Sequence, residues 1–185
     1  MLSQEEGKEL LRLARDSIKS FFESKDVRVK EEIMKRFSEK QGVFVTLTID
    51  GDLRGCIGYP EPIFPLYEAV INSARSAAFS DPRFSPLTKE EFKDVHLEIS
   101  VLTVPELIKA KPDDYVKKIK VGEDGLIVRS AYGSGLLLPQ VAIEYKWDAK
   151  QFLEHTCEKA GLNKNSWKEK SILVYKFQAQ IFEEG

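Results

Sequence analysis

The chain has 185 residues, of which 42% are hydrophobic and 31% charged, a composition typical of a soluble globular domain with a sizeable core. Its formal net charge is −2 and its basic residues are interleaved with acidic ones, so a nucleic-acid-binding surface is not indicated. No apolar run approaches the roughly 20 residues of a membrane-spanning helix, which argues against a membrane partner.

The N-terminal segment is predicted to form a long amphipathic helix that ends near Ser24. Ser3 and Glu6 have the spacing of a capping box at its start. Apolar residues then recur at helical spacing: Leu10, Leu11, Leu13, Ala14, Ile18, Phe21 and Phe22. The polar and acidic start of the chain, Met1–Glu6, is unlike a signal peptide.

A β-hairpin with an Asp50-Gly51 turn is predicted next. Its first strand alternates Val43, Val45, Leu47 and Ile49 with Phe44, Thr46 and Thr48. On the return strand, Leu53, Ile57 and Tyr59 are predicted to face the core, and Arg54, Cys56 and Gly58 to share the opposite face.

The length of the hairpin loop decides which residues pair. A two-residue loop would pair Ile49 with Asp52 and mix the apolar and polar faces. A three-residue loop with a bulge keeps apolar residues opposite one another and is therefore predicted. Either Phe44 or Thr46 then lies across from Cys56.

The rest of the chain alternates short strands with scattered helices. We predict a helix over 66–77, a rigid proline loop over 81–86, a strand over 95–101, a helix start at 112–114, strands over 126–128 and 136–138 with a turn at 132–135 between them, a helix over 148–160 and a last strand over 172–182. This order favours an α+β fold, with a mostly antiparallel sheet and flanking helices, as one domain over 1–185 that could fold as two lobes.

The segment Leu53–Gly58 carries the clearest functional signal. Glycine costs stability inside a strand, so Gly55 and Gly58 suggest the close approach of another group, and Gly58 leaves room for a ligand. Arg54 lies about 7 Å along the strand from Cys56, where a cation would favour the thiolate. The alternative is that Cys56 is a small buried residue under a helix.

Two further side chains have alternative interpretations of the same kind. Arg54 could bind a carboxylate or phosphate of a ligand, or could pair with an acidic side chain of the protein. His96 shares a strand face with Glu98 and Ser100. It could act as a base toward Cys56 if the strands are neighbours, or could be a partly exposed sheet residue.

The second cysteine is predicted to be structural. Cys157 falls on one helical stripe with Ala149, Leu153 and Ala160, whereas His155 lies on the flank of that helix. With two histidines, two cysteines and no ligand-spaced cluster, no metal site is indicated, and no cofactor motif occurs. Two cysteines in 185 residues favour a reducing, cytoplasmic location, and the many charged residues favour a thermophilic source.

The motif and several other stretches resemble the AMMECR domain family, named after the Alport-syndrome, midface-hypoplasia and elliptocytosis chromosomal region. The matching stretches are Gly42–Leu47, Leu53–Gly58, Ala78–Phe84, Ser100–Leu102, Gly125–Val128, Leu137–Ala142, Trp147–Asp148 and Lys159–Leu162. The resemblance covers nearly the whole chain and is that of a stand-alone archaeal or bacterial member.

The resemblance implies an α+β fold of two unequal lobes, the larger containing both termini, with Leu53–Gly58 as the functional site. It implies no established reaction. Arg83 and Gln140 lie in matching stretches and are candidates to line the same cleft. Prokaryotic members resemble components of a system with Memo-like and radical S-adenosylmethionine proteins, which suggests redox or radical-modification chemistry by association.

Two functional hypotheses follow. In the first, the protein is a thiol-dependent enzyme in which Cys56 acts as nucleophile or redox thiol on a small anionic or modified substrate, with Arg54 orienting it. In the second, it is a non-catalytic binding or scaffold protein in which Leu53–Gly58 forms a groove for a small molecule or a protein. The sequence leaves a homodimer open.

Overall fold

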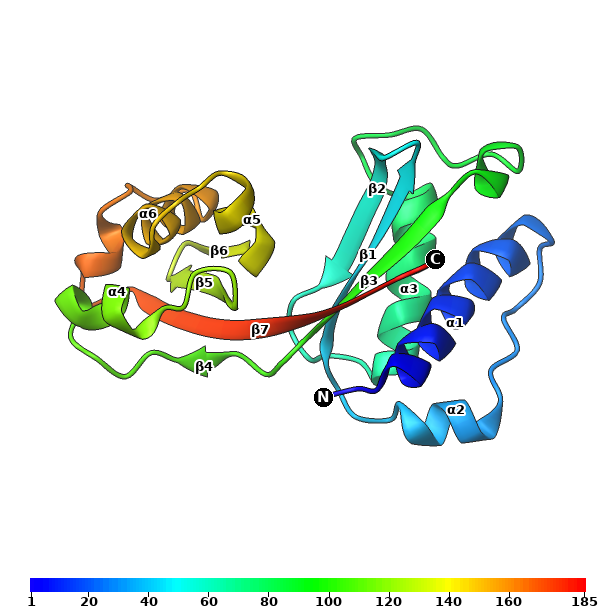
Figure 1. The fold of residues 1–185 in the computed structure, drawn as a ribbon, viewed down its shortest axis with the longest axis horizontal. Helices are drawn as coiled ribbons and strands as arrows, with labels where there is room; N and C mark the ends of the chain where they lie inside the picture. Colours follow the sequence, from blue (N-terminus) through cyan, green and yellow to red (C-terminus); the bar gives the residue numbers. More distant parts are fainter. The chain divides into compact units, whose positions relative to one another are not determined.

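The computed structural model describes residues 1–185 and divides into two compact units. Unit 1 comprises Met1–Leu102 with Gln180–Gly185, and unit 2 comprises Thr103–Ala179. Unit 1 is the larger and contains both termini, as the family resemblance implies. Both units combine helices with antiparallel strands, so the α+β prediction is confirmed (Figure 1).

Unit 1 is a sheet with helices on one face. Its elements are α1 (Gln4–Phe22), α2 (Glu31–Arg36), β1 (Gly42–Ile49), β2 (Asp52–Tyr59), α3 (Leu66–Phe79), a 3-10 turn (Glu91–Lys93), β3 (His96–Leu102) and the end of β7 (Leu173–Glu183). The strand order is β2-β1-β3-β7, so β2 is the edge strand. Helices α1 and α3 cover one face of this sheet (Figure 1).

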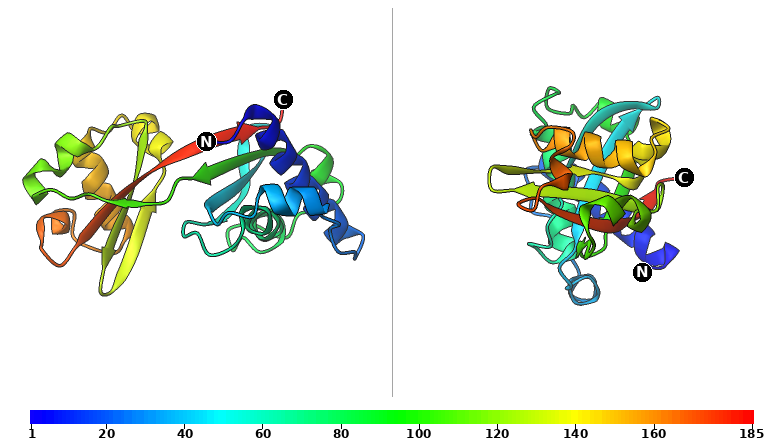
Figure 2. Two further views of the ribbon diagram at one scale, coloured as in Figure 1. Left: turned by 90° about the horizontal axis from the view of Figure 1, so that it is seen from below. Right: turned by 90° about the vertical axis from the view of Figure 1, so that its left-hand side faces the viewer.

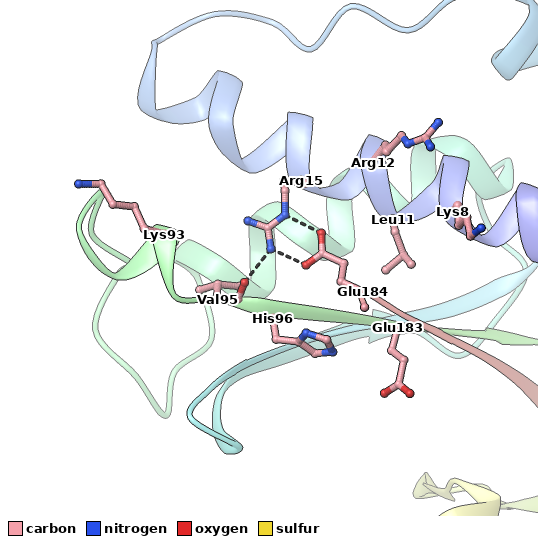
Figure 3. A pocket seen from close by; sticks show the side chains of 10 residues that line it. Lys8, Leu11, Arg12, Arg15, Lys93, Val95, His96, Glu183 and Glu184 are labelled. Atoms are coloured by element: carbon pink, nitrogen blue, oxygen red, sulfur yellow. Dashed lines mark hydrogen bonds and ion pairs between the residues drawn. The ribbon is translucent and has the colours of Figure 1, made fainter.

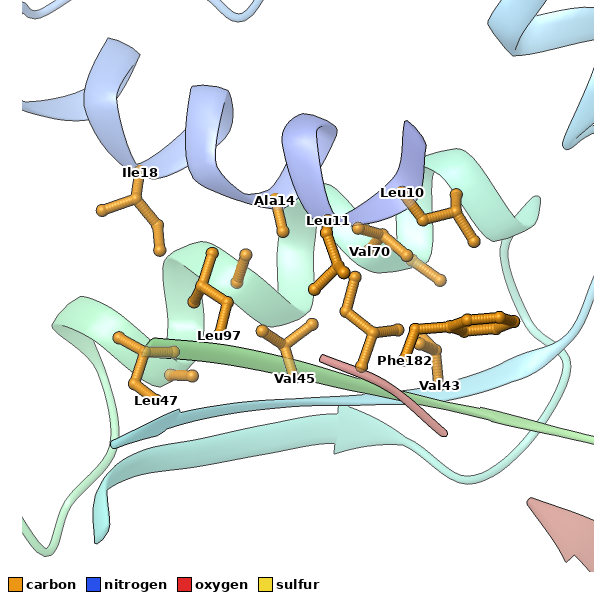
Figure 4. Close-up of a cluster of buried hydrophobic side chains, with 14 of the residues drawn as sticks. Leu10, Leu11, Ala14, Ile18, Val43, Val45, Leu47, Val70, Leu97 and Phe182 are labelled. Carbon is orange, nitrogen blue, oxygen red and sulfur yellow. The ribbon is translucent and has the colours of Figure 1, made fainter. Parts of the chain in front are cut away.

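The core of unit 1 lies between that sheet face and the two helices. Alternate residues of β1 and β3 point into it, because successive side chains of a strand point to opposite faces. Figure 4 shows the strand residues Val43, Val45, Leu47 and Leu97 under the helix residues Leu10, Leu11, Ala14, Ile18 and Val70. The capping box predicted at Ser3 and Glu6 starts α1. The opposite sheet face carries the intervening, mostly polar side chains.

The β1–β2 hairpin differs from the prediction in its loop. The loop has two residues, Asp50 and Gly51, and both have positive φ, 52° and 85°. Such a turn matches the twist of paired strands, so the three-residue prediction was wrong. Ile49 pairs with Asp52, and a bulge next to Leu47 then restores the apolar alignment.

The bulge changes which residues of β2 face the core. Leu47 pairs with Gly55 and Thr48 with Leu53, so Arg54 is the extra residue of the bulge. Leu53 consequently shares a face with Thr48 and is 42% exposed. The prediction that Leu53 faces the core was therefore wrong, because the bulge reverses the alternation between Leu53 and Gly55.

Unit 2 has its own sheet and core. Its elements are β4 (Glu106–Leu107), a 3-10 turn (Pro112–Asp114), α4 (Tyr115–Lys118), β5 (Asp124–Ser130), β6 (Gly133–Leu137), α5 (Pro139–Glu144), α6 (Ala149–Lys159), a 3-10 turn (Ser166–Lys168) and the first part of β7. β7 pairs antiparallel with β4 and β5, and β5 with β6. Helix α6 packs on β5 and β6 (Figure 2, α6 in orange).

Short elements account for most differences from the prediction. The turn predicted at 132–135 is largely strand β6, which starts at Gly133. Gly135 in this strand allows the backbone at the end of α6 to approach closely. Helices α2 and α5 were missed, and each has only six residues. None of the helices has both the length and the apolar character needed to cross a membrane.

Candidate functional site

Cys56 lies in the middle of the edge strand β2 and is half-buried. Its cross-strand partner is Thr46, which decides between the two alternatives, Phe44 and Thr46, that the sequence left open. The hydroxyl of Thr46 donates a hydrogen bond to the Cys56 sulfur, with Oγ1 and Sγ 3.2 Å apart.

The backbone of Cys56 forms hydrogen bonds at the outer edge of the sheet, on the side of β2 that has no neighbouring strand. Its N–H donates to Asp81 Oδ2 at 2.9 Å, and its carbonyl oxygen accepts from Arg83 Nη2 at 3.2 Å. Both groups would otherwise be unpaired at a strand edge. The loop after α3 thus covers the edge with two side chains and fixes the position of the thiol.

Asp81 is the centre of this loop, and its side chain is only 1% exposed. Its carboxylate accepts bonds from the backbone N–H, Nε and Nη2 of Arg83, in addition to the Cys56 N–H. The Arg83 guanidinium, with help from these N–H groups, lowers the pKa of Asp81 well below its usual value. The pKa of Arg83 is raised, first by Asp81 and to a smaller extent by the negative charge available at Cys56.

Arg54 has an acidic partner within the protein. Its Nε and Nη2 lie 3.0 and 3.1 Å from the two carboxylate oxygens of Glu91, and Nη2 also donates to the carbonyl of Ser85. The Arg54 side chain is 12% exposed. Thr88 and Glu91 form the reciprocal hydrogen bonds of a capping box, so Glu91 is already held in place. The pairing matches the ion-pair interpretation of Arg54 rather than an open anion site.

Replacing Arg54 by methionine is expected to lower the free energy of unfolding at pH 7 by about 1–2 kcal/mol, since the pair is only partly shielded from solvent. Arg54, followed by the Thr88 N–H, lowers the pKa of Glu91 from 4.5 to about 2. A lowered pKa means that the contribution is complete above pH 4.5 and is lost as the pH falls toward 2.

The measurement for Arg54 is urea unfolding at pH 7, 4 and 3. The difference between wild type and Arg54→Met should shrink over that range. Arg12→Met, on the exposed side of α1, is the control and should have little effect at any pH. A difference that stays constant down to pH 3 would contradict the Arg54–Glu91 contribution.

Both glycines of the motif are explained by close packing. A methyl group at Gly55 would overlap the carbonyl oxygen of Ala77 in α3, and one at Gly58 would overlap the Val43 carbonyl and the Phe44 residue of β1. The close approach that the sequence indicated is therefore real, and the approaching groups belong to the protein. The Phe44 ring takes the space beside Gly58.

The sheet face that carries Cys56 is polar and half-buried. Thr46 pairs with Cys56 on one side and with Glu98 on the other, so these three residues form one row across β2, β1 and β3. His96 pairs with Thr48 and lies one step along the same face. Burial raises the pKa of Glu98, the nearby Glu183 raises it further, and the Ser100 hydroxyl and His96 partly offset this.

His96 also lines a shallow pocket of about 550 Å³ between α1, β3 and the end of β7 (Figure 3). In this pocket Arg15 forms a bidentate ion pair with Glu184 and donates to the carbonyl of Val95. Strand β3, which carries His96, is a neighbour of the β1–β2 hairpin. The β3 residue in one row with Cys56 is Glu98, however, and not His96.

The remaining residues singled out in the sequence lie in unit 2. Gln140 is in α5, and its Oε1 is buried without a hydrogen-bond partner, whereas the other predicted site residues belong to unit 1. Cys157 is fully buried, and that burial raises the pKa of its thiol to about 11. His155 stacks on Trp147 and bonds Glu158. Cys157 is thus the structural cysteine that its helical stripe predicted.

Two residues beside Cys56, Asp81 and Glu98, were not singled out in the sequence, and Thr46 was named only as one of its two possible cross-strand partners. The signal for Asp81 was present, because an acid followed by proline and arginine in a rigid loop is suited to local side-chain bonds. Thr46 and Glu98 each lie on the polar face of an alternating strand. That these residues lie in one row with Cys56 depends on strand order and register, which local sequence patterns do not reveal.

Fold and site together define an α+β protein of two units, with a half-buried thiol held at the edge of the larger unit's sheet. A model of the AMMECR1 family matches residues 11–182. The chain belongs to the AMMECR1 family, as the resemblance indicated.

Similar proteins occur in archaea and bacteria. A protein of Methanothermobacter thermautotrophicus is 50% identical over 99% of this chain and 96% of its own length. One of Aquifex aeolicus is 45% identical over 96% of this chain and 92% of its own length. The crystal structure of the uncharacterized protein PH0010 from Pyrococcus horikoshii has a TM-score of 0.92 and 47% identity, covering 99% of this chain and 93% of that one.

Proposed function

We propose that the protein is a thiol-dependent enzyme in which the sulfur of Cys56 is the reacting atom. The contrast between its two cysteines carries the proposal. Cys56 is half-buried on a polar sheet face and accepts a hydrogen bond from Thr46, whereas Cys157 is fully buried and its pKa is raised to about 11. A reactive cysteine needs access and a polar setting, and of the two cysteines Cys56 is the one that has both.

In this proposal the two arginines have different roles. Arg83 is the cation beside the thiol, because its guanidinium bonds the Cys56 carbonyl while half of its side chain stays exposed to a substrate. Arg54 holds the loop through Glu91 and does not bind the substrate. A small substrate with an anionic or modified group would approach Arg83 from solvent and Cys56 along the polar sheet face.

The test is the pH dependence of iodoacetamide alkylation in the native protein, followed by peptide mass spectrometry at both cysteines. Cys56 is expected to react at least about 100-fold faster than Cys157 at pH 7.5, because the Cys157 thiol is both inaccessible and poorly ionised. Cys157 in urea-unfolded protein provides the rate of a free thiol. If native Cys56 remains unlabelled while the unfolded control reacts, the enzyme proposal is wrong.

A second candidate function is a non-catalytic binding protein, and one observation favours it. The ion pair of Arg54 and the packing of Gly55 and Gly58 explain most of Leu53–Gly58 without any reaction. A binding groove would keep its ligand when Cys56 is replaced by serine. A panel of small electrophiles, screened by intact mass, separates the two: adducts lost in Cys56→Ser support the enzyme, and the absence of adducts in the wild type supports the binding protein.

A further inference from the structure

We propose that Glu98 is the proton acceptor for the Cys56 thiol, with the Thr46 hydroxyl as the hydrogen-bonding group between them. This inference rests on the proposed thiol chemistry and adds the group that would receive the proton. It concerns three residues on three neighbouring strands, β2, β1 and β3, and does not involve His96 as the base.

The first observation is the register. Thr46 is the direct partner of both Cys56 and Glu98, and directly paired residues point to the same sheet face. Two interstrand steps of about 4.8 Å separate the Cα atoms of Cys56 and Glu98 by about 10 Å. The Thr46 hydroxyl already reaches the sulfur at 3.2 Å. The Glu98 carboxylate accepts from Ser100 in the structure and would turn toward the Thr46 hydroxyl to receive the proton.

The second observation is the setting of Glu98. It is half-buried on this face, and the Ser100 hydroxyl donates to its Oε1 at 3.4 Å. The charged groups around it are Glu183 on β7 and His96 on its own strand. Burial and the charge of Glu183 raise the pKa of Glu98, which makes its carboxylate a better base near neutral pH than an exposed glutamate.

The proton transfer can be written for the probe reaction. The thiol proton of Cys56 moves to the Thr46 oxygen while the Thr46 hydroxyl proton moves to Glu98, so the threonine ends unchanged and the glutamate neutral. The sulfur keeps the electron pair and attacks the methylene carbon of iodoacetamide. A carbon–sulfur bond forms, the carbon–iodine bond breaks, and iodide leaves. The hydroxyl then donates to the sulfur, as it does in the structure.

The experiment compares the rate of Cys56 alkylation between pH 5.5 and 9.5 in wild type, Glu98→Gln, Thr46→Val, Thr46→Ser and His96→Gln. Glu98→Gln and Thr46→Val are expected to slow alkylation at pH 6.5 by about tenfold, and to leave the rate at pH 9.5 unchanged because hydroxide then takes the thiol proton in place of the carboxylate. Thr46→Ser should restore the wild-type profile. His96→Gln should not slow the reaction.

Two outcomes would overturn the assignment. A Glu98→Gln rate at pH 6.5 above that of wild type would mean that Glu98 is only a like charge that opposes the thiolate. A loss in His96→Gln without a loss in Glu98→Gln would make His96 the base. Thermal melts of each variant and the rate at pH 9.5 report on folding. Failure of the proposed function is distinct, because Cys56 would then be unlabelled in the wild type itself.

Discussion

Replacement of Asp81 by alanine is expected to lower the free energy of unfolding by about 2–3 kcal/mol, because it removes a buried carboxylate that accepts several hydrogen bonds. The side chain is 1% exposed and accepts bonds from Cys56 and Arg83. Its loss leaves the Cys56 N–H unpaired at the sheet edge and the Arg83 guanidinium without its carboxylate. Urea unfolding at pH 7 measures the loss.

The matched control is another aspartate in an ion pair, at the surface. Asp114 pairs with Lys117, and their side chains are 46% and 77% exposed. Asp114→Ala should leave the free energy of unfolding almost unchanged, because solvent screens such pairs. Equal losses in the two variants would mean that the Asp81 network adds no more than a surface contact does.

Asp81→Ala should also differ from wild type in how its stability changes at acid pH. The pKa of Asp81 is lower in the folded protein than its usual value of 3.8, so its stabilising contribution is complete above about pH 4 and is lost as the pH falls below that value. Wild type should therefore lose stability in this range faster than Asp81→Ala does. The variant should also change the alkylation rate of Cys56, since the backbone at that residue loses its hydrogen bond to the loop.

Replacement of Gly55 by alanine is expected to cost about 2–3 kcal/mol of unfolding free energy, through overpacking. The added methyl would overlap the Ala77 carbonyl oxygen, which belongs to the backbone of α3 and cannot rotate away. Either the helix or the edge strand must shift. Urea unfolding or the shift in Tm measures the cost.

Gly133→Ala is the control for this prediction. Gly133 also lies in a strand, but the nearest atom to an added methyl is the Ala160 carbonyl oxygen at 3.8 Å, an ordinary contact. Its stability should stay within about 0.5 kcal/mol of wild type. If Gly55→Ala were as stable as Gly133→Ala, the glycine would not be there for helix packing, and a role in admitting a ligand would regain support.

Much of the fold could be predicted because its signals are local. The capping box at Ser3 and Glu6 is formed as its spacing predicted. The alternation in β1 and β3 identified their buried faces, and the helical stripe of Cys157 identified that thiol as structural. The short helices α2 and α5 escaped prediction because six residues hold too little periodicity to recognise.

The sequence indicated which residues could matter: a strand with two glycines, one arginine and one cysteine, in a chain of balanced charge. The contacts of each residue depend on the tertiary structure. Arg54 meets an acid 37 positions away, Cys56 meets Asp81 25 positions away, and the row to Glu98 crosses three strands. These pairings depend on strand order, register and a one-residue bulge, and a shift of one residue moves a side chain to the opposite face of the sheet.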